Sequence, residues 1–188
     1  RMLVELDSIH DEVGIPFPYV THDQGEAMSI SDTIAVMNKG KVEQIATPVE
    51  IYEAPRSSFV AAFIGDTNFF DGKVKEVRGE YSLIDIEGFA DVWVFNDKHV
   101  RVGSDVHLSL RPEKLFIYSE EPPAREKHNL VKGVVEEVIY LGSQTKYWVR
   151  VGDYRVAVMR QHRRFLLDEK KPIAWNDEAG RPWAPGTA

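Results

Sequence analysis

Apolar residues in the first third of the chain follow helical spacing, interrupted by short runs that suit strands. Between residues 2 and 13 the apolar positions recur three to four residues apart, which predicts a helix that ends at Gly14. Thr47 and Pro48 suit the N-cap and first turn of a later helix. The predicted elements are helices over residues 2–13, 24–30, 48–54 and 57–64, a strand over 17–21, and a hairpin of strands over 33–37 and 41–46.

The rest of the chain alternates apolar and polar residues in the way that is typical of strands. β-Branched and aromatic residues are frequent in these runs, and glycines separate them. The predicted strands span residues 70–77, 81–87, 91–95, 106–110, 115–118, 131–141, 145–151 and 155–159, and residues 120–128 suit a linker. Many short strands with turn signals predict a small barrel or sandwich. The predicted fold class is therefore α+β, with helices and strands first and an all-β part after them.

A short internal repeat lies at the start of two predicted strand runs. Residues 72–77 and 133–138 both fit the pattern G-x-V-x-E-V. Such a match arises either by chance between two hairpin openings or from a β unit that the chain uses twice. The sequence leaves both interpretations open.

Charge divides the chain into two parts near residue 66. Residues 1–66 hold four Lys or Arg against eleven Asp or Glu, a net charge of −7, whereas residues 67–188 hold 19 of each. We therefore predict two domains with these boundaries and different surfaces. The absence of cysteine excludes disulfides and thiol catalysis, and the longest apolar run, Phe59–Ile64, is far shorter than the roughly 20 residues of a membrane span. The overall charge of −7 argues against nucleic acid as a partner.

His22 is the residue that most suggests chemistry. It directly follows the apolar run that ends at Thr21, and the helix predicted from residue 24 begins two positions later. In α/β folds ligands collect beyond the carboxyl ends of strands, where an imidazole can donate a hydrogen bond to a phosphate or position a water. A structural histidine is the alternative, and the sequence assigns His22 no acid or base partner. The next residue, Asp23, suits a helix cap.

A longer pattern surrounds His22 and continues to residue 65. It comprises Tyr19–Gln24, Glu26–Met28, Ile34–Gly40, Gln44-Ile45, Thr47-Pro48, Ile51-Tyr52, Pro55 and Phe59–Gly65. With these residues, positions 1–66 closely resemble the end of the nucleotide-binding subunit of ABC importers, whose VTHDQ stretch carries the switch histidine. The stretch Leu108–Leu115, with Arg111-Pro112-Glu113 after a strand, resembles the OB-like accessory β domain of the same subunits, called TOBE. Residues 66–69 and Ala174-Trp175 are most similar to polyamine importers.

The resemblance implies a role for His22 in the complete importer subunit. His22 would contact the γ-phosphate of ATP and help to align the attacking water, so it is the residue assigned to both catalysis and cofactor binding. ATP and Mg²⁺ would be bound by the parent subunit. This chain has no P-loop pattern, because Gly40-Lys41 and Gly72-Lys73 lack the required spacing and the following Ser or Thr. It also has no apolar strand ending in Asp-Glu and no Ser-Gly-Gly-Gln signature.

We therefore expect a C-terminal fragment that starts at Arg1, hydrolyses no ATP by itself and needs no metal or cofactor of its own. The parent subunit would pair with a second copy of itself and with membrane subunits, on the cytoplasmic face of the cell membrane. Its solute would be a polyamine, with iron and sugar as alternatives. Because the strand over 17–21 lacks neighbours here, we expect a dimer or a rearranged start of the chain. The rival hypothesis is a stand-alone regulatory module whose β domain binds a small ligand.

Overall fold

The structure is a computed structural model that describes residue 10 and residues 12–118, 122 and 129–162. It divides into two compact units, residues 1–66 and residues 67–188, each of which is described by itself. Most of the helix predicted over residues 2–13, most of the predicted linker and the tail with Trp175 lie outside the described residues. In the described part of the chain, no helix is long and apolar enough to cross a membrane.

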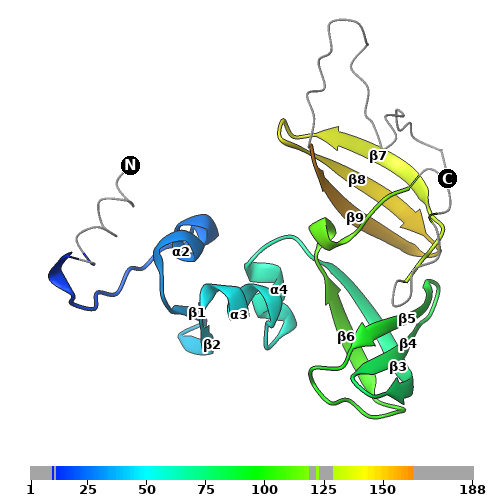
Figure 1. Cartoon of the computed structure of the whole chain (residues 1–188), viewed down its shortest axis with the longest axis horizontal. Coiled ribbons are helices and arrows are strands. Elements are labelled where there is room, and N and C mark those ends of the chain that lie inside the picture. The colour runs from blue at the N-terminus through cyan, green and yellow to red at the C-terminus, as the bar shows by residue number, and fades with distance from the viewer. Residues whose placement is uncertain (1–9, 11, 119–121, 123–128, 163–188) are drawn as a thin grey trace, which may run out of the picture. The chain divides into compact units, whose positions relative to one another are not determined.

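The first unit consists of short helices and one hairpin (Figure 1). Its elements are α2 (Gln24–Ile30), β1 (Ile34–Asn38), β2 (Lys41–Ala46), α3 (Pro48–Glu53) and α4 (Ser58–Phe63). β1 and β2 are antiparallel, and the two residues of the turn, Lys39 and Gly40, have φ values of 47° and 77°. Positive φ at both positions is the requirement of a tight hairpin turn, which confirms the predicted hairpin.

Side-chain caps set the start of each helix in this unit. Asp23, Thr47 and Ser57 each accept a hydrogen bond from the backbone N–H three residues further on. Such caps satisfy N–H groups that the helix itself leaves unpaired. The predicted helices over 24–30 and after Thr47 are therefore confirmed. The helices close over a small core whose buried apolar side chains are Ile34, Val36, Ile51, Val60 and Ile64.

Residues 17–21 do not form a strand, so this prediction is wrong for the chain as described. The segment has no regular structure, and the side chain of Val20 is 95% exposed. A strand needs a neighbour that supplies hydrogen bonds, and in the described part of this unit β1 and β2 pair only with each other. The dimer that we expect from such an apolar segment stays a prediction.

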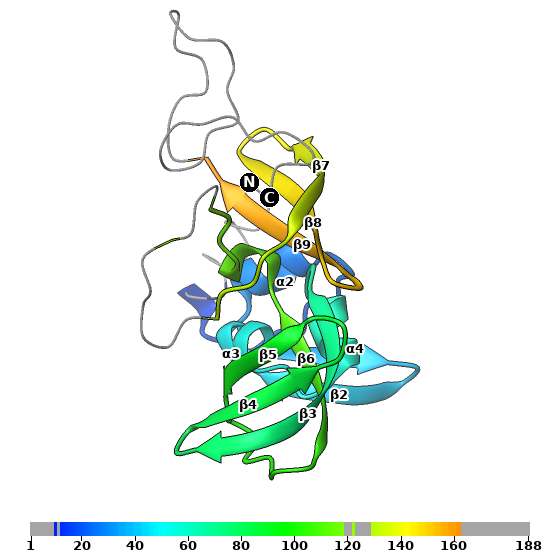
Figure 2. The ribbon, with the colours of Figure 1, turned by 90° about the vertical axis from the view of Figure 1, so that its right-hand side faces the viewer.

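The second unit contains two antiparallel sheets, whose strands lie side by side in both views (Figures 1 and 2). The strands are β3 (Asn68–Arg78), β4 (Tyr81–Ile86), β5 (Ala90–Phe95), β6 (Asp105–Leu110), β7 (Val134–Tyr140), β8 (Gln144–Val151) and β9 (Tyr154–Gln161). The order is β5-β4-β3-β6 in the first sheet and β7-β8-β9 in the second. The β character of this part is thus confirmed, as a pair of sheets that share a core, with a second buried cluster of Val135, Tyr147 and Val158.

Apolar side chains from both sheets form that core. Phe70, Val74 and Ile84 of the first sheet meet Val151 and Val156 of the second. Buried Asn68 adds a polar link between the sheets, because its amide contacts the backbone of both. Its Oδ1 accepts from the N–H of Ala157 at 2.7 Å, and its Nδ2 donates to the carbonyls of Ala157 and Leu110 at 2.8 and 3.2 Å.

The two copies of the internal repeat, residues 72–77 and 133–138, have the same local structure. A Cβ added to Gly72 would lie 2.7 Å from the carbonyl oxygen of Asp85, and one added to Gly133 would lie 2.8 Å from that of Arg150. Each glycine therefore lets its strand approach the partner strand closely. The Val two positions later is buried in both copies, and the pairing shifts register directly after it. These shared features favour a β unit used twice over a chance match.

Residues 115–118 are not a strand, which corrects a second prediction. A short 3₁₀ helix, η1 (Pro112–Lys114), precedes them, and no regular structure follows it. The backbone of this segment is held by a side chain instead, since Arg160 of β9 donates to the carbonyl of Ile117 at 3.1 Å. The composition of this run suits a strand, but none of the described strands pairs with it.

Candidate functional site

His22 lies in the loop between the extended segment and helix α2, and its side chain is exposed. As predicted, it lies just before the capped start of a helix, but the strand expected before it at residues 17–21 is absent from the described residues. Among the described residues, no hydrogen bond to its imidazole is present. The loop therefore presents an imidazole to solvent.

The two residues that flank His22 are both anchored to Glu26 in the first turn of α2. The hydroxyl of Thr21 donates to Oε2 of Glu26 at 2.7 Å, and the hydroxyl of Tyr19 donates to the same oxygen at 2.9 Å. Asp23 accepts from the Glu26 backbone N–H at 3.0 Å, and its own N–H donates to Thr21 Oγ1 at 3.0 Å. The loop thus has a defined conformation although its surface is open to water.

Two further observations describe the surroundings of this loop. The hydrogen bond to the Glu26 carboxylate raises the pKa of Tyr19 above its ordinary value, because ionisation would lose that bond and add a second negative charge. On the other side of His22, the amide of Gln24 donates to the carbonyl of Phe63 at the end of α4. The loop and two helices of the first unit are therefore joined by side-chain hydrogen bonds.

The chemistry of this loop suits one contact to a phosphate rather than a complete active site. A neutral imidazole can donate one hydrogen bond to a phosphate oxygen. Groups of three or more His, Asp or Glu that could hold a metal ion are absent from the described residues. The loop thus offers a single imidazole that could contact a phosphate oxygen.

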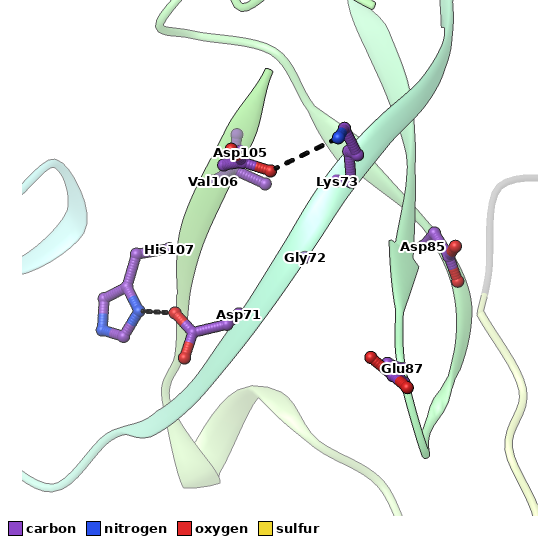
Figure 3. A pocket seen from close by; sticks show the side chains of 8 residues that line it. All are labelled: Asp71, Gly72, Lys73, Asp85, Glu87, Asp105, Val106 and His107. Carbon is purple, nitrogen blue, oxygen red and sulfur yellow. Dashed lines mark hydrogen bonds and ion pairs between the residues drawn. The ribbon is translucent and has the colours of Figure 1, made fainter. Parts of the chain in front are cut away.

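A hollow on the β unit was not predicted from the sequence. It is lined by Asp71, Gly72, Lys73, Asp85, Glu87, Asp105, Val106 and His107 (Figure 3). His107 Nδ1 lies 2.6 Å from Asp71 Oδ1, and Lys73 pairs with Asp105 at 3.9 Å. Its residues come from β3, from β4 and the turn after it, and from β6, which pairs with β3 although the two strands are distant in the sequence. Four carboxylates against one Lys and one His give this surface an acidic character that does not suit an anion.

Comparisons with known proteins show what the chain is similar to. Residues 108–188 match the family of TOBE domains, and the relatives that match nearly the whole chain are import ATP-binding proteins. The chain is therefore similar to TOBE domains over residues 108–188 and to import ATP-binding proteins over nearly its whole length. The relatives themselves are spermidine/putrescine import ATP-binding proteins. That of Protochlamydia amoebophila is 57% identical over 178 residues, which is 94% of this chain and 48% of the relative.

Two further relatives have the same description. The spermidine/putrescine import ATP-binding proteins of Thermotoga maritima and Fusobacterium nucleatum are each 45% identical, over 98% and 97% of this chain. The chain covers 50% of each of them. It therefore spans about half the length of the curated relatives that it matches, in the part that contains their TOBE domain.

Proposed function

We propose that this chain forms the part of a polyamine-importer ATP-binding subunit that holds the switch histidine and the TOBE domain. The observation that carries the proposal is the high identity with spermidine/putrescine import ATP-binding proteins over nearly the whole chain. The exposed imidazole of His22 in an anchored loop supports it, because such a group can reach a bound phosphate. The alternatives of iron and sugar as solutes have no comparable support.

The chemical role of His22 follows from the demands of phosphoryl transfer. Catalysis of that reaction consists largely of positioning and of stabilising charge on the γ-phosphate oxygens. An imidazole N–H directed at one of these oxygens would supply such stabilisation, and its fixed place would help to align the attacking water. ATP, when bound, would supply the phosphate. The loop of this chain would position the His22 imidazole to contact it.

The chain by itself is expected to hydrolyse no ATP. Its sequence offers no P-loop for the phosphates and no Asp-Glu strand end for Mg²⁺. In the complete subunit, a nucleotide-binding core would provide these groups. Two copies of the subunit would close on ATP and drive membrane subunits on the cytoplasmic face of the membrane, and the β unit would contact its counterpart and tune activity.

A chimeric subunit tests this proposal, since the chain matches about half of its relatives. This chain replaces the matching half of the Protochlamydia amoebophila protein, and phosphate release from ATP is measured. The chimera should turn over ATP, and His22→Ala should lower turnover by about 100-fold, the usual cost of removing one charge-stabilising donor. His107→Ala, the same change in the β unit, should leave turnover within about twofold of the parent. Equal turnover in the His22→Ala and parent chimeras would contradict the proposal.

The rival hypothesis, a stand-alone module that binds a small anion, has little support from the structure. The hollow in the described part of the β unit is acidic, and its Lys73 and His107 are already paired with carboxylates. A thermal-shift measurement separates the two hypotheses, because a ligand that binds the native state raises its melting temperature. Stabilisation of the 188-residue chain by a small anion at millimolar concentration would favour the module.

A further inference from the structure

The hydrogen bonds around the His22 loop converge on one carboxylate. A single oxygen of Glu26 accepts from two hydroxyls that precede His22, those of Tyr19 and Thr21, at 2.9 and 2.7 Å. Hydrogen bonds to an ionised acceptor are stronger than those between neutral groups. One residue of helix α2 thus fixes the course of the chain on the N-terminal side of His22.

The C-terminal side of His22 is tied to the same turn of α2. Asp23 Oδ1 accepts from the backbone N–H of Glu26, and the backbone N–H of Asp23 donates to Thr21 Oγ1, both at 3.0 Å. The Thr21 hydroxyl is therefore a donor to Glu26 and an acceptor from Asp23 at once. Rotation of the backbone at His22 would break at least one member of this closed ring of hydrogen bonds.

We propose that Glu26 is a positioning residue that sets the direction of the His22 imidazole through Tyr19 and Thr21. The inference rests on the proposed function, because it concerns the residue that would meet the γ-phosphate. Helix capping does not account for the Glu26 carboxylate: Asp23 already caps α2 with its own side chain, and Glu26 contributes to that cap only its backbone N–H. The carboxylate acts on the loop before the helix.

The positioning role differs from a stabilising role in what it predicts. Hydrogen bonds on an exposed surface contribute little to folding individually, because water replaces them. The geometry of a reacting group is more sensitive, since a misplacement of about 1 Å can cost about 100-fold in rate. Loss of the carboxylate should therefore change the order of the His22 loop far more than the stability of the unit.

The first experiment measures the order of His22 by NMR in the 188-residue chain. In Glu26→Ala, the backbone order parameter of His22 should fall and its χ1 should average over rotamers, while the chemical shifts of α2 remain helical. Glu26→Gln should stay close to the parent, because a side-chain carbonyl also accepts from both hydroxyls. Tyr19→Phe and Thr21→Val, which each remove one donor, should have smaller effects than Glu26→Ala.

Glu50→Ala is the matched control for this experiment. Glu50 also lies in the first turn of a helix of this unit, and its carboxylate also accepts from a hydroxyl, that of Thr47 at 2.8 Å. The Glu50→Ala variant should leave the order of His22 unchanged. An unchanged His22 in Glu26→Ala would overturn the inference, as would loss of helix α2 in that variant or an equal change in Glu50→Ala.

The second experiment uses the chimeric subunit and separates this inference from the proposed function. Glu26→Ala should lower kcat for ATP by about 10-fold or more with little change in KM, and Glu26→Gln should restore most of it. If His22→Ala leaves turnover unchanged, the proposed function itself fails. If His22→Ala lowers turnover and Glu26→Ala leaves kcat unchanged, only the positioning role fails.

Discussion

At the scale of single residues, Asn68 shows how one side chain can join two sheets. Its amide makes three hydrogen bonds to backbone groups of β6 and β9, and the residue is 8% exposed. An amide is both donor and acceptor, so it can pair with N–H and C=O of one residue as a neighbouring strand would. No aliphatic side chain of this size can replace these bonds.

Asn68→Asp tests the link between the sheets. The substitution keeps the size of the side chain but removes both donors, so it leaves two carbonyls facing a carboxylate. We expect the free energy of unfolding of the β unit to fall by about 3 kcal/mol, the cost of leaving buried polar groups unpaired. Urea unfolding followed by tryptophan fluorescence measures this change.

Asn129→Asp is the matched control for that substitution. The Asn129 amide also binds the N–H and C=O of one residue, Trp93, both at 2.7 Å, but on an exposed surface. Water can replace these bonds, and the expected loss is below about 1 kcal/mol. Equal losses in the two variants would contradict the role assigned to Asn68.

Single residues also show where sequence reasoning stops. The spacing around His22 correctly predicts the cap at Asp23 and the helix after it, because caps depend on neighbours in the chain. The hydrogen bond from Tyr19 to Glu26 was not predicted, because the two residues are seven positions apart and meet only through the course of the loop. The acidic hollow was not predicted either, because β6, which contributes Asp105 and His107, is distant in the sequence from β3 and β4.

At the scale of elements, helix α3 has a complete capping box. Thr47 accepts from the backbone N–H of Glu50, and the Glu50 carboxylate accepts from the Thr47 backbone N–H at 3.0 Å. That backbone hydrogen bond, followed by the one from the Thr47 hydroxyl, lowers the pKa of Glu50 from its ordinary value. The charged carboxylate is therefore favoured in the folded helix.

The lowered pKa of Glu50 predicts how the stability of the first unit depends on pH. The ionised Glu50 carboxylate adds to the free energy of unfolding. This contribution is fully present above the pKa of Glu50 in the unfolded chain, and it is lost as the pH falls through the lower pKa of the folded state. Urea unfolding monitored by circular dichroism should thus show a smaller loss of stability below about pH 4 in Glu50→Gln than in the parent. Identical pH dependence in the two chains would contradict the capping-box account.

Strands and turns also show which elements a pattern can predict. The alternation of apolar and polar residues correctly predicts strands such as β4 and β8, because one face of each is buried and the other is not. Residues 17–21 and 115–118 have the composition of strands but lack a hydrogen-bonded neighbour. The residue types in a segment show whether it suits a strand. Whether the strand forms also depends on a neighbouring strand, which another part of the chain must supply.

At the scale of the whole molecule, the two compact units predict unfolding in more than one step. All four tryptophans belong to residues 67–188, and the described α-helices α2, α3 and α4 belong to residues 1–66. Tryptophan fluorescence therefore follows one unit, and the helical circular dichroism signal follows the other. We expect the helical signal to be lost first, because the first unit has the smaller apolar core.

Unfolding in urea is followed by tryptophan fluorescence and by circular dichroism, and the midpoints of the two curves are compared. Different midpoints are expected, since coincident transitions are the sign of a single cooperative unit. Coincident curves for fluorescence and circular dichroism would contradict the description of two units with separate cores.

We propose His22 as the switch histidine of a polyamine-importer ATP-binding subunit. The most direct test is the structure of the chimeric subunit with Mg²⁺ and a non-hydrolysable ATP analogue. If His22 has this role, one of its imidazole nitrogens should lie within about 3 Å of a γ-phosphate oxygen, the length of a hydrogen bond. The proposed role would be wrong if the His22 imidazole faced away from the nucleotide and another residue were hydrogen-bonded to that oxygen.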